Sequence, residues 1–238
     1  MTVGPVVAIV PAYDAARTVG EVVRGLLESF AAMPGDGTVI VVDDGSTDST
    51  SSVAAAAGAV VLRHAANRGK GAALRTGFEH ALSRGAAMAV TVDADGQHLP
   101  DEARRLAAYE ASDDALVLGV RDLLAAGAPR ANRFSNGISN FFLSLFTGRE
   151  LHDTQCGLRR YPLARTLALG PRDDGYAFEA ECILRALRAA WNVVEVPVKV
   201  YYPPEAERVS HFHVVRDPAR IVFRVVATLA TTHAEAAR

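Results

Sequence analysis

Residues 87–98 read AMAVTVDADGQH, an apolar run that stops at two carboxylates. The run 87–92 has the composition of a buried strand. Asp93 and Asp95 follow it directly, and Gly96 lets the chain turn. Mg²⁺ and Mn²⁺ prefer such oxygen ligands, so the pair predicts a metal site at the mouth of the strand. The alternative is that the two carboxylates only form a turn or cap the next helix. The next polar side chains, which are further possible ligands, are Gln97 and His98.

The same alternation of apolar strands and helices runs through the first half of the chain. Strands are expected at 6–10, 38–42, 59–62, 87–92 and 116–120. Helices are expected at 17–30, 49–57, from the 67–71 loop to 82, and 99–109. The pattern predicts an α/β fold, with a mostly parallel, Rossmann-like sheet and helices on both faces. In the less regular second half we expect helices at 132–146, 177–190 and 217–231, and one or two strands within 192–202.

The polar turns after the first four strands are expected to meet at one edge of the sheet, where such folds bind ligands. Tyr13 can stack on a base or seal the end of the sheet. Asp43 and Asp44 can accept hydrogen bonds from a nucleotide, or form an Asx turn with the residues that follow. These turns are Pro11-Ala12-Tyr13, Asp43-Asp44-Gly45, Asn67 to Gly71 and Asp93-Ala94-Asp95.

Gly69 and Lys70 open a helix, and backbone N–H groups at a helix start can hold an anion. The spacing excludes a Walker phosphate loop, because His64 stands where that motif needs its first glycine. Leu74 likewise occupies the third glycine position of a dinucleotide fingerprint. The loop therefore has either a general anion-binding role or a structural one.

The amino-acid composition excludes several classes of protein. The 238 residues carry a formal net charge of −2, so no binding of nucleic acid is expected. Two cysteines, Cys156 and Cys182, do not make a disulfide framework, which favours a reduced cytoplasmic location. No apolar run reaches the length of about 18 residues that a transmembrane helix needs. The N-terminus lacks the features of a signal peptide.

Four motifs together resemble the family 2 glycosyltransferases, which have the GT-A fold. They are PAYD (11–14), VVDDGSTD (41–48), NRGKGAALRTGF (67–78) and VDADGQH (92–98). Two further motifs resemble the polyprenyl-phosphate (dolichyl-phosphate) sugar transferases within that family. These are GVRD (119–122) and DTQCGLRRY (153–161).

The resemblance implies an inverting, metal-dependent hexosyltransferase. It would move a sugar from a UDP-glucose-like or GDP-mannose-like donor to a polyprenyl phosphate, with Mg²⁺ or Mn²⁺ as cofactor. NRGKGAALRTG and DTQCG look slightly more like the UDP-glucose branch. One alternative is the same donor chemistry on a hydroxyl of a glycan or small molecule. An alternative of another class is a nucleotidyltransferase or a nucleotide-binding regulator.

The resemblance also implies roles for residues. Asp93 and Asp95 would hold the metal with help from Gln97. Arg121 and Arg133 would hold the diphosphate and the acceptor phosphate, as bidentate arginines do; their alternatives are a surface ion pair and a solvated helix face. The nucleotide sugar would contact Pro11, Ala12, Tyr13, Asp14, Asp43, Asp44, Gly69, Lys70, Asp93 and Ala94. Asp14 departs from the family, which often has Glu or Asn there.

The acceptor decides whether a general base is needed. A lipid phosphate is already anionic and needs none, whereas a hydroxyl needs a base within hydrogen-bond reach. Asp153 is the first candidate, and Glu179 and Glu181 are weaker ones. The alternative for Asp153 is a structural acceptor of backbone N–H groups.

The expected domains are a GT-A domain at 1–205 and an acceptor loop with an amphipathic helix at 206–238. In that loop Arg208 and Ser210 fit phosphate contacts. The lysine that the mannosyl branch carries is missing, and His211 or His213 is expected to replace it as metal ligand or phosphate donor.

Two helices offer peripheral contact with the cytoplasmic face of a membrane. The last helix has Arg216, Arg220 and Arg224 on one face, and the Phe-rich helix within 134–146 has an apolar face. The alternative for each helix is packing against the protein core.

Overall fold

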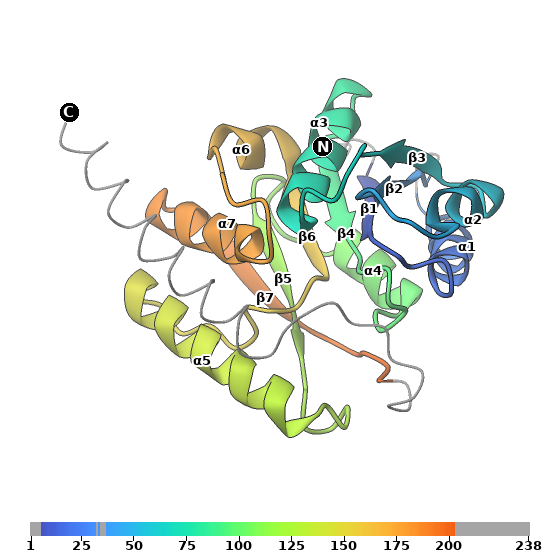
Figure 1. The fold of residues 1–238 in the computed structure, drawn as a ribbon. Coiled ribbons are helices and arrows are strands. Elements are labelled where there is room, and N and C mark those ends of the chain that lie inside the picture. Colours follow the sequence, from blue (N-terminus) through green and yellow to red (C-terminus); the bar gives the residue numbers. More distant parts are fainter. Residues whose placement is uncertain (1–5, 32, 34–36, 203–238) are drawn as a thin grey trace.

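The computed structural model describes residues 6–31, 33 and 37–202 (Figure 1). Within them one sheet has the strand order β3-β2-β1-β4-β6-β5-β7. Its strands are β1 (Val6–Ala12), β2 (Val39–Asp43), β3 (Val60–Arg63), β4 (Met88–Thr91), β5 (Leu116–Arg121), β6 (Arg159–Pro162) and β7 (Val193–Val198). The helices are α1 (Val19–Phe30), α2 (Thr50–Ala56), α3 (Lys70–Ser83), α4 (Pro100–Ala107), α5 (Arg130–Thr147), α6 (Leu163–Ala168) and α7 (Ala177–Arg188).

The mostly parallel sheet that the sequence predicts is confirmed. β1 pairs in parallel with β2 and β4, β2 with β3, and β5 with β7. β6 is the exception, because it pairs antiparallel with both β4 and β5. Thus β6 joins the two parallel parts of the sheet into one.

β6 and α6 were not expected from the sequence. Arg159, Arg160 and Pro162 do not have the composition of a strand, yet all of β6 is buried. The guanidinium groups are accommodated by backbone carbonyls: Arg159 donates to Cys156, Thr154 and Glu179, and Arg160 donates to Ala107 and Tyr109. This compensation comes from distant segments, so a local sequence pattern does not show it.

Helices cover both faces of the sheet (Figure 1). Val7 and Ile9 of β1 pack on the side that α3, α6 and α7 cover. Ala8 and Val10 point to the opposite side, which α1, α2 and α4 cover. Alternate side chains of β1 therefore belong to two different hydrophobic cores, as expected for a strand that is buried on both faces.

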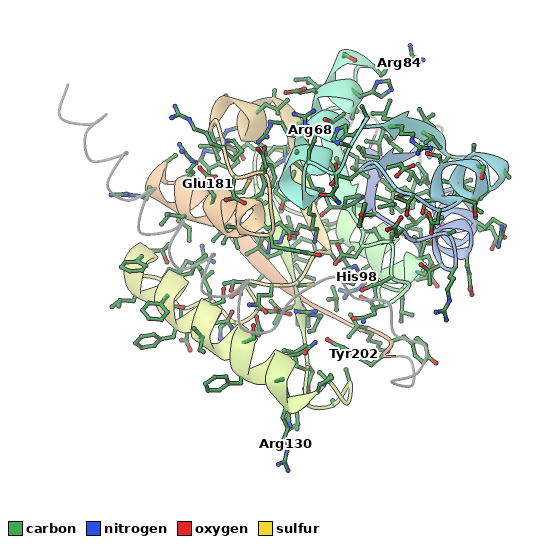
Figure 2. All side chains as sticks on the ribbon, viewed as in Figure 1. Arg68, Arg84, His98, Arg130, Glu181 and Tyr202 are labelled. Carbon is green, nitrogen blue, oxygen red and sulfur yellow. The ribbon has the colours of Figure 1, made fainter. Side chains whose placement is uncertain are left out.

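The chain beyond β7 turns back across the loop that follows β4. Val200 bridges His98, and the Tyr201 N–H donates to the Gln97 carbonyl over 2.8 Å. This contact brings Tyr202 beside the loop. Figure 2 labels His98 and Tyr202, which lie near each other in that view.

The predicted acceptor loop, the domain boundary at 205 and the last helix fall within 203–238, outside the described residues. Those expectations therefore stay predictions. In the described part of the chain, no helix combines the length and the apolar character needed to cross a membrane.

Candidate functional site

A cavity of about 550 Å³ opens where β1, β2, β4 and β5 end. The structure brings most of the predicted site residues together there, from segments far apart in the sequence. Those that line the cavity are Pro11, Ala12, Tyr13, Asp44, Gly69, Lys70, Asp93, Ala94, Asp95, Gln97 and Arg121. The expected meeting of polar turns at one edge of the sheet is therefore present.

Lys70 is one of the two cations among the described residues that line the cavity, together with Arg121. Its ammonium group lies 2.7 Å from Asp93 Oδ1 and 2.9 Å from Glu179 Oε2. Loss of hydration would by itself lower the pKa of Lys70, but the two carboxylates outweigh it and raise that pKa above its usual value. The same contact outweighs desolvation at Asp93 and holds the pKa of Asp93 below its ordinary value. Lys70 and Asp93 are therefore both charged at neutral pH.

Asp95 faces the cavity from the turn after Asp93. Its Oδ1 accepts the Gln97 N–H over 2.9 Å, and Thr18 holds the turn by donating to the Ala94 carbonyl over 2.6 Å. Desolvation and then the charge of Asp93 raise the pKa of Asp95. A carboxylate that is costly to ionise gains from a nearby cation, so the electrostatics of this turn suit a metal or a positively charged ligand.

The donor set fits a divalent cation that shares its ligands with a substrate. Mg²⁺ usually binds through one or two carboxylates and substrate phosphates, while keeping several waters. Asp93 and Asp95 supply the carboxylates, and the cavity supplies room for a diphosphate. Among the described residues no cluster of three or more His, Cys, Asp or Glu side chains forms a complete protein cage.

His98 forms part of the cavity wall. Its Nδ1 accepts the Asp93 backbone N–H over 3.3 Å, and its Nε2 lies 4.0 Å from Cys156 Sγ. Burial lowers the pKa of His98 to about 4, so its ring is neutral at pH 7. Both ring nitrogens are directed at protein atoms, which makes His98 a support for the Asp93 turn.

Arg121 and Asp153 form a buried, bidentate pair. Arg121 Nε lies 2.7 Å from Asp153 Oδ2, and its Nη2 lies 3.0 Å from Oδ1. Asp153 also accepts the backbone N–H groups of Arg121 and Gln155. Arg121 lines the cavity, whereas Asp153 lies behind it and is almost fully buried. These contacts fit the alternative in which Asp153 is a structural acceptor of backbone N–H groups.

Asp44 binds the start of α3. Its two oxygens accept the N–H groups of Arg68 and Gly69 over 2.9 and 2.7 Å, and its Oδ1 lies 2.6 Å from His64 Nδ1. Further along the first turn, the Ala72 N–H donates to the Asp174 carbonyl. The helix start thus already holds a carboxylate of the protein, as its dipole favours.

The remaining predicted residues lie away from the cavity lining. Asp43 is fully buried and accepts hydrogen bonds from the Ser46 backbone and the Ser51 hydroxyl, as in the Asx-turn alternative. Asp14 accepts hydrogen bonds from Thr47. Arg133 lies on α5, outside the lining. Arg208, Ser210, His211 and His213 lie outside the described residues.

Several lining residues were not predicted or were weak candidates. Tyr176 and Tyr202 both line the cavity, and they follow Gly175 and precede Pro203 in the sequence, respectively. An aromatic residue in a loop is the only sequence feature that could have indicated either of them. Glu179 was a weak candidate; its Oε1 has no hydrogen-bond partner within the described part of the chain. The others are Ala15, Asn67, Ala73, His98, Leu123, Pro129, Asn132, Thr154 and Gln155.

Gly157 gives a direct test of the Asp93 position. A methyl group at residue 157 would collide with the Asp93 carboxylate. Gly157→Ala is therefore expected to displace Asp93 and to weaken nucleotide binding in the presence of Mn²⁺ by about tenfold or more. Isothermal titration calorimetry with UDP and with GDP measures this affinity.

Gly137→Ala is the matched control, because a methyl group there meets no atom within 4 Å. It lies in α5, where Ala is favoured over Gly, so the control should bind as the natural protein does. Equal affinity of the two variants would show that Asp93 does not need its present position.

Comparisons with known proteins agree on one family. The family profile described as Glycosyl transferase family 2 matches residues 7–163. The chain is 28% identical over 217 residues to UDP-N-acetylglucosamine–dolichyl-phosphate N-acetylglucosaminyltransferase of Methanococcus voltae, covering 82% of this chain and 84% of that protein. It is 33% identical over 178 residues to polyprenol monophosphomannose synthase of Mycolicibacterium smegmatis, covering 67% and 65%.

Solved structures share the fold. The chain is similar to glucosyl-3-phosphoglycerate synthase from Mycobacterium tuberculosis, crystallised with Mn²⁺, UDP-glucose and phosphoglyceric acid. The TM-score is 0.70 at 19% identity, and the match covers 96% of this chain and 79% of the other. The GT-A-like fold expected from the sequence is therefore confirmed.

Proposed function

The chain belongs to glycosyl transferase family 2, and from that premise we propose that it transfers a sugar from a nucleotide sugar to a polyprenyl phosphate. One observation carries the proposal: two carboxylates and two cations, Asp93, Asp95, Lys70 and Arg121, line a single cavity. A nucleoside diphosphate needs both, since its phosphates attract cations and its metal needs carboxylates. The relatives named above supply the class of acceptor.

The reaction is a direct displacement with inversion at the anomeric carbon. An oxygen of the acceptor phosphate forms the new bond to that carbon, while the bond to the donor diphosphate breaks and the nucleoside diphosphate leaves. Asp93 and Asp95 would hold Mg²⁺ or Mn²⁺. When bound, that ion neutralises the charge of the leaving diphosphate.

The side chains of the cavity have separate tasks in this reaction. Tyr13, with Pro11 and Ala12, forms the wall for the nucleoside. Arg121 faces the phosphates with the guanidinium edge that Asp153 does not bind, and Lys70 places a second positive charge beside Asp93. Fixed charges of this kind stabilise the developing negative charge because they need no rearrangement during the reaction.

The contacts of Asp153 favour a phosphate as the acceptor. Both of its oxygens are bound to Arg121, so it is poorly placed to take a proton from a hydroxyl. An anionic phosphate needs no such base. If the acceptor were a hydroxyl, Glu179 would be the other candidate base because it lines the cavity, but its Oε2 binds Lys70 and its Oε1 lies 4.0 Å from Arg159 Nε.

Incubation with UDP- and GDP-sugars, Mn²⁺ and a polyprenyl phosphate tests the proposal. We expect labelled sugar in the lipid product together with free nucleoside diphosphate. Nucleoside diphosphate released only with a glycan or a small alcohol would favour a hydroxyl acceptor instead. Release of pyrophosphate would favour a nucleotidyltransferase. Omission of the divalent cation is expected to abolish transfer. A cytoplasmic location stays a prediction.

A further inference from the structure

The helix α5 has its polar side inward and its apolar side outward. Ser135, Asn136 and Ser139 on its inner side are almost completely buried. On its outer side, Phe134 is 72% exposed and Phe141 is 63% exposed. A surface helix of a globular protein normally buries its apolar face, but α5 buries only Leu143 and part of Phe146 and leaves these phenylalanines exposed. Phe134, Phe141 and Leu145 thus form an exposed apolar face, whereas Leu143 packs in the core as the alternative holds; contact of the face with a membrane stays a prediction.

Hydrogen bonds fix this orientation. Asn140 donates to the His152 carbonyl over 2.6 Å and accepts the Thr154 N–H over 2.9 Å. Ser139 accepts the Thr154 hydroxyl over 2.8 Å, and Gln155 donates to Ser135. Rotation of α5 to bury its phenylalanines would break all of these bonds and leave buried polar groups without partners.

The same hydrogen bonds connect the outer helix to the cavity. Thr154 and Gln155 both line it, and so does Asn132 in the first turn of α5. The apolar face of α5 begins two residues further along, at Phe134, and Leu124, which is 73% exposed, lies in the loop before the helix, next to the lining residue Leu123. The face thus starts near the rim of the cavity and continues along the helix for about 16 Å, from Phe134 to Leu145.

The outer side of α5 also carries positive charge near the cavity. Arg130 is exposed at the first residue of the helix, and Figure 2 shows it pointing away from the rest of the protein. Cations beside an exposed aromatic face are the combination that favours the boundary between lipid headgroups and acyl chains.

We propose that the apolar face of α5, formed by Phe134, Phe141 and Leu145, docks on a bilayer that contains anionic lipid. This docking surface rests on the proposed function, because the acceptor phosphate must reach the cavity while its hydrocarbon chain stays in the membrane. Because the apolar face starts near the rim of the cavity, both requirements can be met at the same time. The face presents the cavity to the headgroups, and the hydrogen bonds through Thr154 hold the face and the cavity in one fixed relation.

Vesicle binding tests the docking surface without any need for activity. The full chain is mixed with vesicles of phosphatidylcholine containing about one quarter phosphatidylglycerol, and co-sedimentation is measured. The test variant combines Phe134→Ser, Phe141→Ser and Leu145→Ser. The matched control combines Leu82→Ser and Tyr109→Ser, which remove exposed apolar side chains elsewhere. The natural protein and the control are expected to bind, and the test variant to bind at least about tenfold more weakly.

A second measurement separates this proposal from the proposed function. Transfer is assayed with a polyprenyl phosphate embedded in vesicles and with a short, water-soluble prenyl phosphate. The test variant is expected to lose transfer to the embedded acceptor and to keep transfer to the soluble one. If the natural protein transfers to neither acceptor, the proposed function is wrong, while vesicle binding still reports on the docking surface.

Three outcomes would overturn the docking surface. The first is a natural protein that does not bind vesicles. The second is a dimer that the test variant dissociates while vesicle binding is unchanged, which would assign the face to a second copy of the chain. The third is a test variant that melts well below the control and still binds vesicles, which would show that residues 203–238 or another part of the chain cover the face.

Discussion

Asp95→Asn is expected to reduce sugar transfer by about 10²–10³-fold and to leave the protein folded and slightly more stable. The loss of activity follows because a neutral amide replaces a carboxylate in the proposed metal site. The gain in stability follows because desolvation and Asp93 raise the pKa of Asp95 in the folded protein. A carboxyl whose pKa is raised on folding destabilises the fold at pH values above its unfolded pKa, so removing the charge helps at pH 7. The amide oxygen can still accept the Gln97 N–H.

Initial rates of nucleoside diphosphate release and thermal melts at pH 7 measure the two effects. Asp101→Asn is the control, since it makes the same change at an exposed carboxylate on α4. It should match the natural protein in rate. The stability difference should shrink as the pH falls toward the unfolded pKa of an aspartate, because Asp95 then becomes neutral in the natural protein too. An Asp95→Asn variant that keeps its rate within about threefold would remove Asp95 from the reaction.

Arg121→Met is expected to lower the free energy of unfolding by about 3–5 kcal/mol. The change leaves Asp153, whose side chain has no exposed surface, without the cation that binds both of its oxygens. Removal of the whole pair in Arg121→Met with Asp153→Leu should restore most of that stability, because no buried charge is then left alone. Urea unfolding of the single and double variants measures the coupling of the pair.

The double variant also isolates the role of Arg121 in transfer. It should be folded and still inactive, since the cavity has lost a cation that faces the phosphates. Arg165→Met is the control: Arg165 pairs with Asp114 at the surface, where an ion pair contributes little to stability, and it also lies over the Trp191 ring. Normal transfer by the double variant would show that Arg121 serves the fold alone.

The sequence predicts the parts of the site that depend on neighbouring residues. A buried strand followed by Asp93-Ala94-Asp95 requires no distant information, and the parallel sheet then places Tyr13, Asp44 and Lys70 at the same edge. The strands and helices of the first half were predicted for the same reason, because their apolar periodicity is local.

Pairings between distant residues could not be predicted. Arg121 and Asp153 are 32 positions apart, and nothing in either motif shows that each neutralises the other. The same holds for Lys70 with Glu179. Strand β6 could not be predicted either. It starts with two arginines, which predict an exposed segment unless the carbonyl groups that bind them are known. In each case the cost of burying a charge is offset by an atom that the chain supplies only after folding.

The position of β6 has a consequence for the order in which the protein is made. While the ribosome has yet to synthesise residues 159–162, β4 pairs only with β1 and its other side is an open strand edge. Open strand edges can recruit other chains, so this edge of β4 is protected only once β6 has been made. Lys70 likewise lacks one of its two carboxylate partners until Glu179 has been synthesised. The donor side of the site, although encoded first, is therefore completed only after most of the chain has been synthesised.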